Sequence, residues 1–228
     1  ASGLPVGLAA PHVSPDDNVL SRITRAGVQA TLDRAQALTQ AGSLSAQDWG
    51  STGVLEHRIK GKRELPSGKA LPQEQDSWSQ RANAAQVAAA GLPSGSPALW
   101  HSQAAWLRPR RLVAAQLATP GITLRLGCAV QRMSNSGEGW ALWDAQGKLL
   151  AQAPQVVLAS AFDTAALLQS LAGSESGTLL KFPLHPLRGQ ISFGRVDALP
   201  ADVQTQLPPF PVNGHGSFIS GVAAPDNE

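Results

Sequence analysis

Three short stretches of the sequence combine residue types that can bring backbone amides or a planar cation close to a ligand. The chain opens with "ASGLPVG", where Gly3 and Gly7 lack a Cβ atom, so amides can face a pyrophosphate or a flat ring. "VVLASA" is an apolar run that ends in small residues, where a cofactor can lie against the backbone. "PLRGQIS" places Arg188 beside Gly189, which suits a carboxylate or a phosphate. Each stretch also fits an ordinary turn or tight packing, and the residues alone leave both interpretations open.

Side-chain chemistry of the metal or nucleophile type is not indicated. The histidines show no HxxxH or HExxH spacing, which predicts that there is no zinc site, and the sequence has neither a G-x-S-x-G elbow nor a P-loop. Cys128 is the single cysteine and lies in an apolar strand pattern, which favours a core thiol. One cysteine excludes an internal disulfide and is typical of a reducing compartment, so we expect a cytoplasmic protein. Asp163 is interpreted as a helix N-cap rather than a ligand.

Three helices are expected to hold these stretches in place. The longest should begin at Pro15, with Ser14 as its N-cap, and extend to Leu38, since apolar residues recur in this segment close to helical spacing. An alanine-rich run should form a second helix that stops at Gly91. A third should begin near Pro109 and end before "TPG".

The section from Ile122 to Ala159 changes to strand-like patterns. It contains five short strand candidates, which are separated by turn-forming sequences, and two of them should pair as a hairpin around Gly147. "VVLA" is continuously apolar, as in a strand buried on both faces, and a helix follows it. Further strands are expected at residues 53–59, after "PLRG" and after "LPPFPV". The pattern as a whole predicts an α/β (α+β) fold.

Charge and composition restrict the class of partner only loosely. The 228 residues carry a formal net charge of +2 and a pI of about 9.0, which permits an anionic partner without requiring one. The basic stretches "KGKRELPSGK" and "RPRR" fit either a solvated surface or contact with nucleic-acid phosphates. No apolar run approaches the roughly 18 residues of a membrane span, and no signal peptide is visible, so a membrane partner is not expected.

The stretches, in their order along the chain, resemble the D-amino-acid oxidase and glycine oxidase superfamily of flavoproteins. "ASGLPVGLAAPHVSPDDNVLSRI" resembles that superfamily's segment after the first dinucleotide-binding unit, and "AAWLRPRRLVAAQL" resembles its "GGW-x-x-P" and helix. "ITLRLGCAVQRM", "PQVVLASAFDT" and "FPLHPLRGQIS" are similar to its later strands and to "LPV-x-x-x-x-GQ-S". The narrower resemblance is to the FAD-dependent C-terminal domain of the MnmC family of bifunctional tRNA-modification enzymes, over nearly the whole chain.

This resemblance implies part of an FAD-binding Rossmann-type domain and a substrate domain with a mixed or antiparallel sheet. Residues 1–48 and 110–175 would belong to the FAD-binding domain, and residues 49–109 and 176–228 to the substrate domain. The G-x-G-x-x-G fingerprint is expected before Ala1 and a C-terminal flavin-binding segment after Glu228, so the chain reads as an internal fragment. We therefore expect the fragment alone to purify without FAD, as a colourless protein.

The resemblance also implies which residues contact the cofactor and the substrate. Val130 would meet the adenosine end of FAD through its backbone, and Arg188 and Gln190 would lie near the domain junction and the substrate. Two departures from the family pattern are Leu4, where asparagine is usual, and Ala161, where glycine is usual and a Cβ atom would crowd the cofactor. No catalytic side chain is assigned. The implied FAD-binding residues are Ser2, Gly3, Gly7, Val130, Ala159, Ser160 and Ala161.

The activity implied is removal of the carboxymethyl group from carboxymethylaminomethyl-(2-thio)uridine at the tRNA wobble position. The implied partners are tRNA and a fused methyltransferase domain that uses S-adenosylmethionine. Two alternatives stay open. One is a small-molecule amine or amino-acid oxidase of the same superfamily, and the other is a non-catalytic fragment that binds tRNA or a protein.

Overall fold

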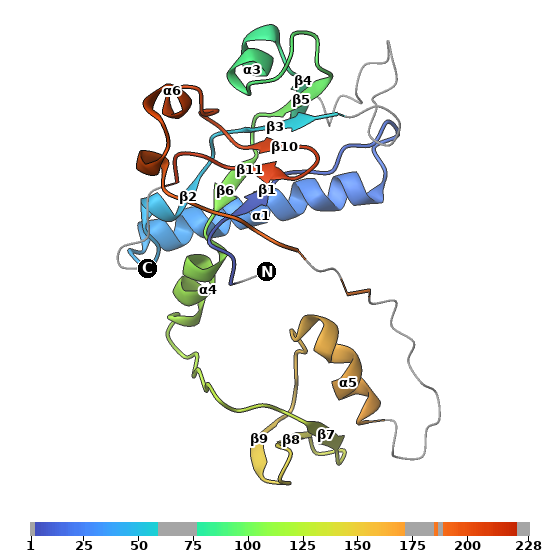
Figure 1. Cartoon of the computed structure of the whole chain (residues 1–228). Helices are drawn as coiled ribbons and strands as arrows, with labels where there is room; N and C mark the ends of the chain where they lie inside the picture. Colours follow the sequence, from blue (N-terminus) through green and yellow to red (C-terminus); the bar gives the residue numbers. More distant parts are fainter. Residues whose placement is uncertain (1–2, 59–76, 172–184, 187–188, 223–228) are drawn as a thin grey trace. The chain divides into compact units, whose positions relative to one another are not determined.

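The computed structural model describes residues 3–58, 77–171, 185–186 and 189–222, arranged as two compact units (Figure 1). The first unit comprises Ala1–Ile122 and Ile191–Glu228, and the second comprises Thr123–Gln190. The predicted allocation of segments to an FAD-binding and a substrate domain stays a prediction.

A five-stranded mixed sheet is the centre of the first unit. Its strand order is β11-β10-β3-β5-β4, in which β10 and β3 are parallel and the other neighbours are antiparallel. The mixed α/β class predicted from the sequence is thereby confirmed. The strands are β3 (Val54–His57), β4 (Ser79–Arg81), β5 (Ala98–His101), β10 (Val212–Asn213) and β11 (Ser217–Phe218).

A second, three-stranded sheet of the first unit has the order β1-β6-β2 and is antiparallel throughout. The close approach of Gly50 in β2 to Trp106 in β6 requires a residue without a side chain, since a Cβ atom at Gly50 would lie 2.8 Å from the Trp106 Nε1 atom. The strands are β1 (Gly7–Ala9), β2 (Trp49–Gly50) and β6 (Ala105–Leu107), and the short 3-10 helix η1 (Ala46–Asp48) leads into β2.

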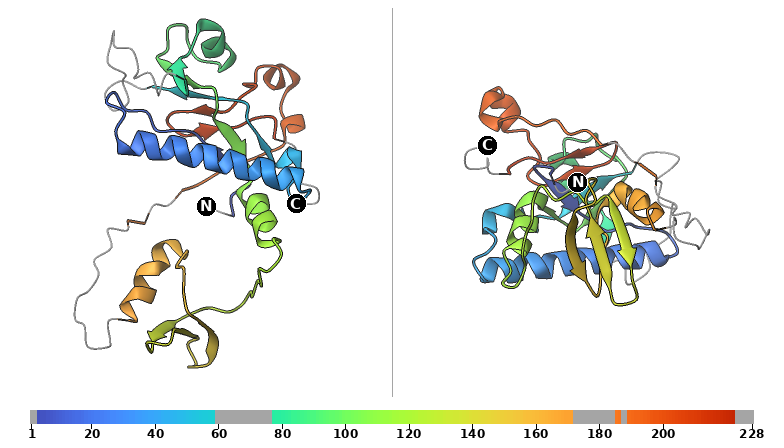
Figure 2. Two further views of the ribbon diagram at one scale, coloured as in Figure 1. Left: turned by 180° about the vertical axis from the view of Figure 1, so that it is seen from behind. Right: turned by 90° about the horizontal axis from the view of Figure 1, so that it is seen from below.

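The long helix α1 (Val19–Gln40) runs alongside these strands in the first unit (Figures 1 and 2). Its N-cap is Asn18, whose side-chain oxygen accepts a hydrogen bond from the Ser21 N–H at 3.1 Å, so the prediction of Ser14 as the N-cap was wrong. The reason is local: Asp17 has a φ of 47° and interrupts the helical conformation before Asn18. Gly42, with a φ of 72°, follows the C-terminus.

Two hydrophobic clusters stabilise the first unit. In one, the α3 (Ala84–Ala89) side of the sheet buries Leu55, Val87 and neighbouring alanines, and the ring of Trp100 packs edge-on against Phe210 at 4.8 Å between centroids. In the other, α1 and α4 (Pro109–Leu117) bury a small group that includes Leu38 and Leu44. Full burial of one such leucine contributes about 1.5–3 kcal/mol. The helices predicted before Gly91 and from Pro109 are confirmed.

The remaining elements of the first unit are short. A 3-10 helix and one helical turn precede the final hairpin, in which the Gly214 N–H donates to the Gly216 carbonyl at 2.8 Å. No strand forms in residues 189–195, so the strand expected after "PLRG" was wrong for the described part of that segment. The elements are η3 (Val196–Ala198) and α6 (Ala201–Gln204).

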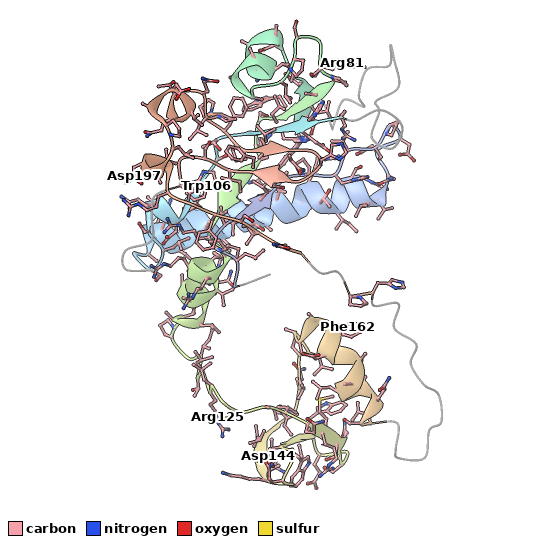
Figure 3. The ribbon with its side chains drawn as sticks, viewed as in Figure 1. Arg81, Trp106, Arg125, Asp144, Phe162 and Asp197 are labelled. Atoms are coloured by element: carbon pink, nitrogen blue, oxygen red, sulfur yellow. The ribbon has the colours of Figure 1, made fainter. Side chains whose placement is uncertain are left out.

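The second unit is a three-stranded antiparallel sheet, in the order β7-β8-β9, followed by a short helix. Asp144 lies in the β8–β9 turn (Figure 3), where its Oδ1 atom accepts the N–H groups of Gln146 and Lys148 at 2.9 and 2.8 Å. Gly147 has a φ of 78°, and the predicted hairpin around it is confirmed. The elements are β7 (Arg132–Asn135), β8 (Trp140–Trp143), β9 (Leu149–Ala153), η2 (Ala161–Asp163) and α5 (Thr164–Gln169).

Two of the five strands expected in this section do not form. Residues 122–127 and 155–160 have no strand pairing in the described part of the chain. Their apolar side chains are exposed or half-buried instead, with Leu126 at 81 % and Val157 at 90 % of full accessibility. Cys128 is also exposed, so the prediction of a core thiol was wrong. An apolar run becomes a buried strand only where neighbouring strands take up its backbone hydrogen bonds.

Candidate functional site

A pocket of about 600 Å³ lies within the second unit, between the sheet, the run before η2 and helix α5. Its volume is in the usual range for a small-molecule or cofactor site. The walls are mostly apolar, with three polar side chains among them. The described residues that line the pocket are Val130, Gln131, Met133, Leu142, Val156, Val157, Leu158, Ala159, Ser160, Asp163, Ala166 and Leu167.

Three of the predicted cofactor-binding residues meet in this pocket. Val130 comes from the segment before β7, whereas Ala159 and Ser160 come from the end of the apolar run "VVLAS". The two segments are about thirty positions apart in the chain, yet they share one lining. The fold brings these three residues together, and their role in binding a cofactor remains a prediction.

Ala161, the next residue, has a left-handed backbone conformation with a φ of 50°. This region costs an L-residue about 1–2 kcal/mol relative to the right-handed region, because Cβ approaches the following carbonyl oxygen. Glycine, which the family pattern has at this position, carries no such cost. The structure therefore supplies a physical reason for the glycine of the pattern and a local strain where this chain has alanine.

The polar side chains of the pocket differ in their hydrogen bonding. The Ser160 hydroxyl is 3.0 Å from the Thr164 hydroxyl, so each group has the other as a hydrogen-bond partner. Asp163 stands at the N-cap position of α5, as predicted, although its side chain makes no capping hydrogen bond. Its backbone is already in the right-handed helical region, with a φ of −70° and a ψ of −12°, as part of η2.

The other predicted glycines lie in the first unit. Gly7 belongs to β1, pairs with Leu107 of β6, and has Pro109 Cγ 3.4 Å from the position of a Cβ atom. Gly3 has no atom within 4 Å of such a position among the described residues. Neither glycine has a left-handed φ. Ser2 lies outside the described residues, and contact of this segment with a cofactor stays a prediction.

The predicted substrate residues are described only in part. Arg188 lies outside the described residues. Gln190 is described and exposed, and it belongs to the second unit. Their contact with a substrate stays a prediction.

Of the two basic stretches, the structure describes only "RPRR". "KGKRELPSGK" falls outside the described residues. In "RPRR", Arg108 is buried, and its Nη1 atom is 3.4 Å from Asp48 Oδ1, while its backbone N–H donates to the Asp48 carbonyl at 2.8 Å. Arg110 and Arg111 are exposed. Arg108 thus ties α4 to η1, whereas the two later arginines of the stretch lie at the surface.

A buried polar chain that the sequence reasoning missed crosses the five-stranded sheet. The Ser79 hydroxyl is 2.8 Å from His101 Nδ1, and His101 Nε2 is 3.0 Å from Glu56 Oε2. Arg58 Nη2 contacts the same carboxylate oxygen at 3.0 Å. A carboxylate only accepts, so Nε2–H donates to Glu56, and in the neutral ring Nδ1 then accepts from the Ser79 hydroxyl. Ser79 and His101 are both 1 % exposed, which closes this chain to substrate and makes it structural.

The register explains why these side chains meet. His101 of β5 is paired with Val54 of β3 on one side and with Ser79 of β4 on the other, and Glu56 lies two residues along β3 from Val54. Alternation then points Glu56, His101 and Ser79 to the same face of the sheet. The polar residues Glu56 in "VLEH" and His101 in "ALWH", each within an apolar strand, were the available signal, but pairing them requires the register.

Another ion pair holds the loop before α1. Arg25, which is 8 % exposed, binds Asp17 through two parallel contacts, Nη1 to Oδ1 at 2.6 Å and Nη2 to Oδ2 at 3.0 Å. The hydrogen bond from Arg25 lowers the pKa of the Asp17 carboxyl below its usual value. This clamp links Asp17, which has a left-handed backbone, to helix α1.

No group of three histidine, cysteine, aspartate or glutamate side chains comes together as a metal site in the ranges that the structure covers. Within the same ranges, none of the helices has the length and the apolar character needed to cross a membrane.

The sequence matches curated proteins along nearly its whole length. It is 45 % identical over 231 residues to the tRNA 5-methylaminomethyl-2-thiouridine biosynthesis bifunctional protein MnmC of Delftia acidovorans, covering 99 % of this chain and 35 % of that protein. It is 44 % identical over 227 residues to the protein of the same name from Paracidovorax citrulli, covering 96 % and 33 %. The chain spans about a third of the length of the curated relatives that it matches.

Two solved structures share the fold. Glycine oxidase from Geobacillus kaustophilus superimposes with a TM-score of 0.52 at 15 % identity, over 72 % of this chain and 46 % of that one. An open form of NikD, an unusual amino acid oxidase of nikkomycin biosynthesis, gives a TM-score of 0.51 at 21 % identity, over 73 % and 43 %. At these identities the likeness shows the architecture alone.

The family model described as "FAD dependent oxidoreductase" matches residues 1–223. This match covers every helix and strand described above, including the pocket of the second unit and both sheets of the first. The resemblance inferred from the sequence is confirmed, and FAD is the cofactor that the family implies. The chain belongs to the FAD-dependent oxidoreductase family.

Proposed function

We propose that the protein containing this chain removes the carboxymethyl group from carboxymethylaminomethyl-(2-thio)uridine at the wobble position of tRNA. The observation that carries the proposal is the 45 % identity over 99 % of the chain to a bifunctional protein of 2-thiouridine biosynthesis in tRNA. Identity of this level along the whole segment supports a shared substrate more strongly than the fold likeness to amino acid oxidases does.

The pocket of the second unit fits one end of FAD. It is mostly apolar, its rim at Ala159 and Ser160 has small side chains, and its volume of about 600 Å³ suits a nucleoside-sized group. Val130, Ala159 and Ser160 would hold the adenosine end there, with Ala161 beside it. Ser2, Gly3 and Gly7 would lie near the flavin or the pyrophosphate. FAD, when bound, supplies the acceptor for a hydride from the carbon next to the substrate's secondary amine.

The residues of the chain have a positioning task in this reaction. Oxidation turns the substrate's amine–methylene bond into an imine, and water then releases glyoxylate and leaves an aminomethyl group on the uridine; molecular oxygen takes up the two electrons as hydrogen peroxide. A fixed cation for the carboxylate would orient the methylene group. We assign this task to Arg188, with Gln190 beside the substrate. Neither the carbon–hydrogen cleavage nor the hydrolysis requires an acid–base side chain from this chain.

The proposed partners are tRNA and a fused methyltransferase domain that uses S-adenosylmethionine and methylates the aminomethyl product. The exposed Arg111 on α4 would contact tRNA phosphates. We also propose a cytoplasmic location, where tRNA is modified.

The test uses the full-length protein with tRNA that carries the carboxymethylaminomethyl group. We expect glyoxylate release from this tRNA and conversion of its wobble nucleoside to the aminomethyl form, measured by mass spectrometry, with no comparable release from free glycine or sarcosine. The Arg188→Ala variant should weaken the reaction with this tRNA, whereas the Arg188→Lys variant keeps the charge and should lose less. Preference for free glycine or sarcosine would instead identify a small-molecule amine oxidase, and a protein that binds tRNA without any release would identify a binding module.

A further inference from the structure

The arginine and lysine side chains in the described part of the second unit gather at one end of its sheet. Arg132 begins β7 and is paired with Trp143 of β8, and Lys148 lies in the turn between β8 and β9. Arg125 donates through Nη1 to the Leu150 carbonyl of β9, which places it at the same end of the sheet. All three cations are exposed, so this end of the unit presents a concentrated positive charge to solvent.

The acidic side chains of the unit neutralise little of this charge. Glu138 lies in the β7–β8 turn, at the opposite end of the sheet, and Asp163 lines the pocket. Asp144 is at the cationic end (Figure 3), but its Oδ1 atom already accepts two backbone N–H groups of the turn. Among the residues that the structure describes, no carboxylate forms an ion pair with Arg132 or Lys148. The cationic end therefore has the charge to bind an anion from outside.

The Arg132 guanidinium is held in place before any anion binds. Its Cζ atom lies over the Trp143 ring, 4.8 Å from the centroid, and the ring is fixed by a hydrogen bond from Nε1 to Ser134 Oγ at 3.2 Å. Met133 and Leu142 line the pocket, and because side chains alternate along a strand, their neighbours Arg132 and Trp143 lie on the opposite face. The ring contacts the flat face of the guanidinium, so the N–H groups at its edge are the ones that can bind a phosphate.

We propose that Arg125, Arg132 and Lys148 bind the phosphate backbone of tRNA, with Trp143 as a positioning residue for the Arg132 guanidinium. The proposal rests on the proposed function, in which tRNA is the substrate, and it adds a contact surface on the face of the sheet away from the pocket. A polyanion with regularly spaced phosphates matches several exposed cations better than a single small anion does. Phosphate contacts position a nucleic acid without reading its sequence, so this surface orients the tRNA.

The experiment titrates the full-length protein with a fluorescently labelled, unmodified tRNA transcript, which has no carboxymethyl group to oxidise, at several salt concentrations. Each phosphate-binding cation contributes about one unit to the slope of log affinity against log salt concentration. Arg132→Gln should therefore lower that slope by about one unit and weaken binding about fivefold, whereas Arg132→Lys should keep the slope and lose less affinity. The combined Arg125→Gln, Arg132→Gln and Lys148→Gln variant should lower the slope by about three units. Arg34→Gln, which removes an exposed cation from α1 of the first unit, is the matched control and should change the slope little.

The positioning role of Trp143 has its own readout. Trp143→Leu should weaken binding about threefold without changing the salt slope, because it removes the ring but no charge. In the Arg132→Gln background the same change should have no effect on affinity, since there is no guanidinium to position. A loss of equal size in both backgrounds would show that Trp143 does not act through Arg132.

A combined variant with the affinity and salt slope of the wild type would overturn the proposal. An equal loss in Arg34→Gln and Arg132→Gln would also overturn it, because net charge rather than this surface would then carry the binding. The two proposals fail separately. Glyoxylate release with wild-type binding by the combined variant contradicts only the contact surface, and the expected salt slopes without glyoxylate release contradict only the proposed reaction.

Discussion

Similar apolar sequence patterns are buried in the first unit and exposed in the second. In the first unit, Leu55 and Leu99 are fully buried, and even the polar His101 is 1 % exposed because its ring nitrogens have partners. In the second unit, Met133 is the one buried hydrophobic side chain among the described residues, whereas Val157 is 90 % exposed. Strand partners make the difference: β3 and β5 have neighbours on both sides, and the run around Val157 has none in the described part of the chain.

The comparison indicates that the first unit supplies its own stability and that the second depends on what binds to it. Each leucine-sized side chain left in water forgoes about 1.5–3 kcal/mol of burial free energy. A ligand that fills the pocket of the second unit would cover part of this apolar surface and would stabilise the unit by mass action. Part of the exposed apolar surface of the second unit is thus the lining of its pocket.

Hydrogen exchange gives the largest expected difference between the units. Amides of β3 and β5 should exchange only through opening of the whole first unit, whereas those of residues 156–159 should exchange almost freely. We expect protection factors to differ by about three orders of magnitude or more. Mass-spectrometric exchange on the 228-residue chain measures both, with the paired central strand β8 as an internal reference. Equal protection of residues 156–159 and of β5 would contradict the comparison.

Removal of the carboxylate shared by His101 and Arg58 should break the first unit. Glu56→Ala leaves a buried guanidinium and a buried imidazole without that acceptor, and we expect a loss of about 3–5 kcal/mol in the free energy of unfolding. Urea unfolding followed by tryptophan fluorescence measures it. Asp197→Ala, which breaks an exposed pair with Arg195, is the control and should have almost no effect. A loss below about 1 kcal/mol for Glu56→Ala would show that the polar chain is not structural.

Gly53 tests how tightly the sheet packs. A Cβ atom there would lie 2.2 Å from the Trp100 ring, and the residue has a φ of 75°. We expect Gly53→Ala to cost about 2–4 kcal/mol, from overpacking and from the left-handed backbone together. Gly95→Ala separates the two causes, because Gly95 has a φ of 80° but open space around it. In the same urea experiment, Gly95→Ala should lower the free energy of unfolding by about 1–2 kcal/mol. Equal losses at the two sites would show that the Trp100 ring moves aside for the new Cβ atom.

Ala161→Gly should stabilise the second unit slightly. The change relieves the cost of a left-handed alanine but adds chain entropy to the unfolded state, so the net gain should be about 0.5–1 kcal/mol. Thermal unfolding monitored by NMR signals of β8 is suited to this small effect. Ala166→Gly in α5 is the opposite control and should cost about 1 kcal/mol. Destabilisation by Ala161→Gly would mean that the alanine is not strained.

The smallest effect concerns the Asp17–Arg25 clamp. Because the pKa of Asp17 is lower in the folded chain than in the unfolded one, the clamp stabilises the first unit fully above the unfolded pKa and loses this contribution as the pH falls through the folded pKa. Carboxyl NMR titration should give a midpoint for Asp17 below about 3.9, the ordinary value. The Arg25→Gln variant should return the midpoint toward that value. An unchanged midpoint in the variant would show that Arg25 does not hold the carboxylate.

Local signals were sufficient to predict the helices, and contacts between distant residues were not visible in the sequence. Gly91 and Pro109 mark a helix end and a helix start by backbone chemistry that acts within a few residues. The exposed run around Val157 was predicted as a buried strand, because burial depends on partners that the run itself does not encode. The buried pairing of Glu56 with His101 depends on strand register, which no single segment contains. The pocket residues Val130 and Ser160 were predicted through the family resemblance.

The most direct test of the account is the fate of the wobble nucleoside. Full-length protein with bound FAD is incubated with tRNA bearing carboxymethylaminomethyl-2-thiouridine, S-adenosylmethionine is left out, and the nucleosides are analysed by mass spectrometry. We expect an aminomethyl nucleoside together with an equal amount of glyoxylate. An unchanged nucleoside, with a protein that holds FAD and oxidises a free amino acid instead, would contradict it.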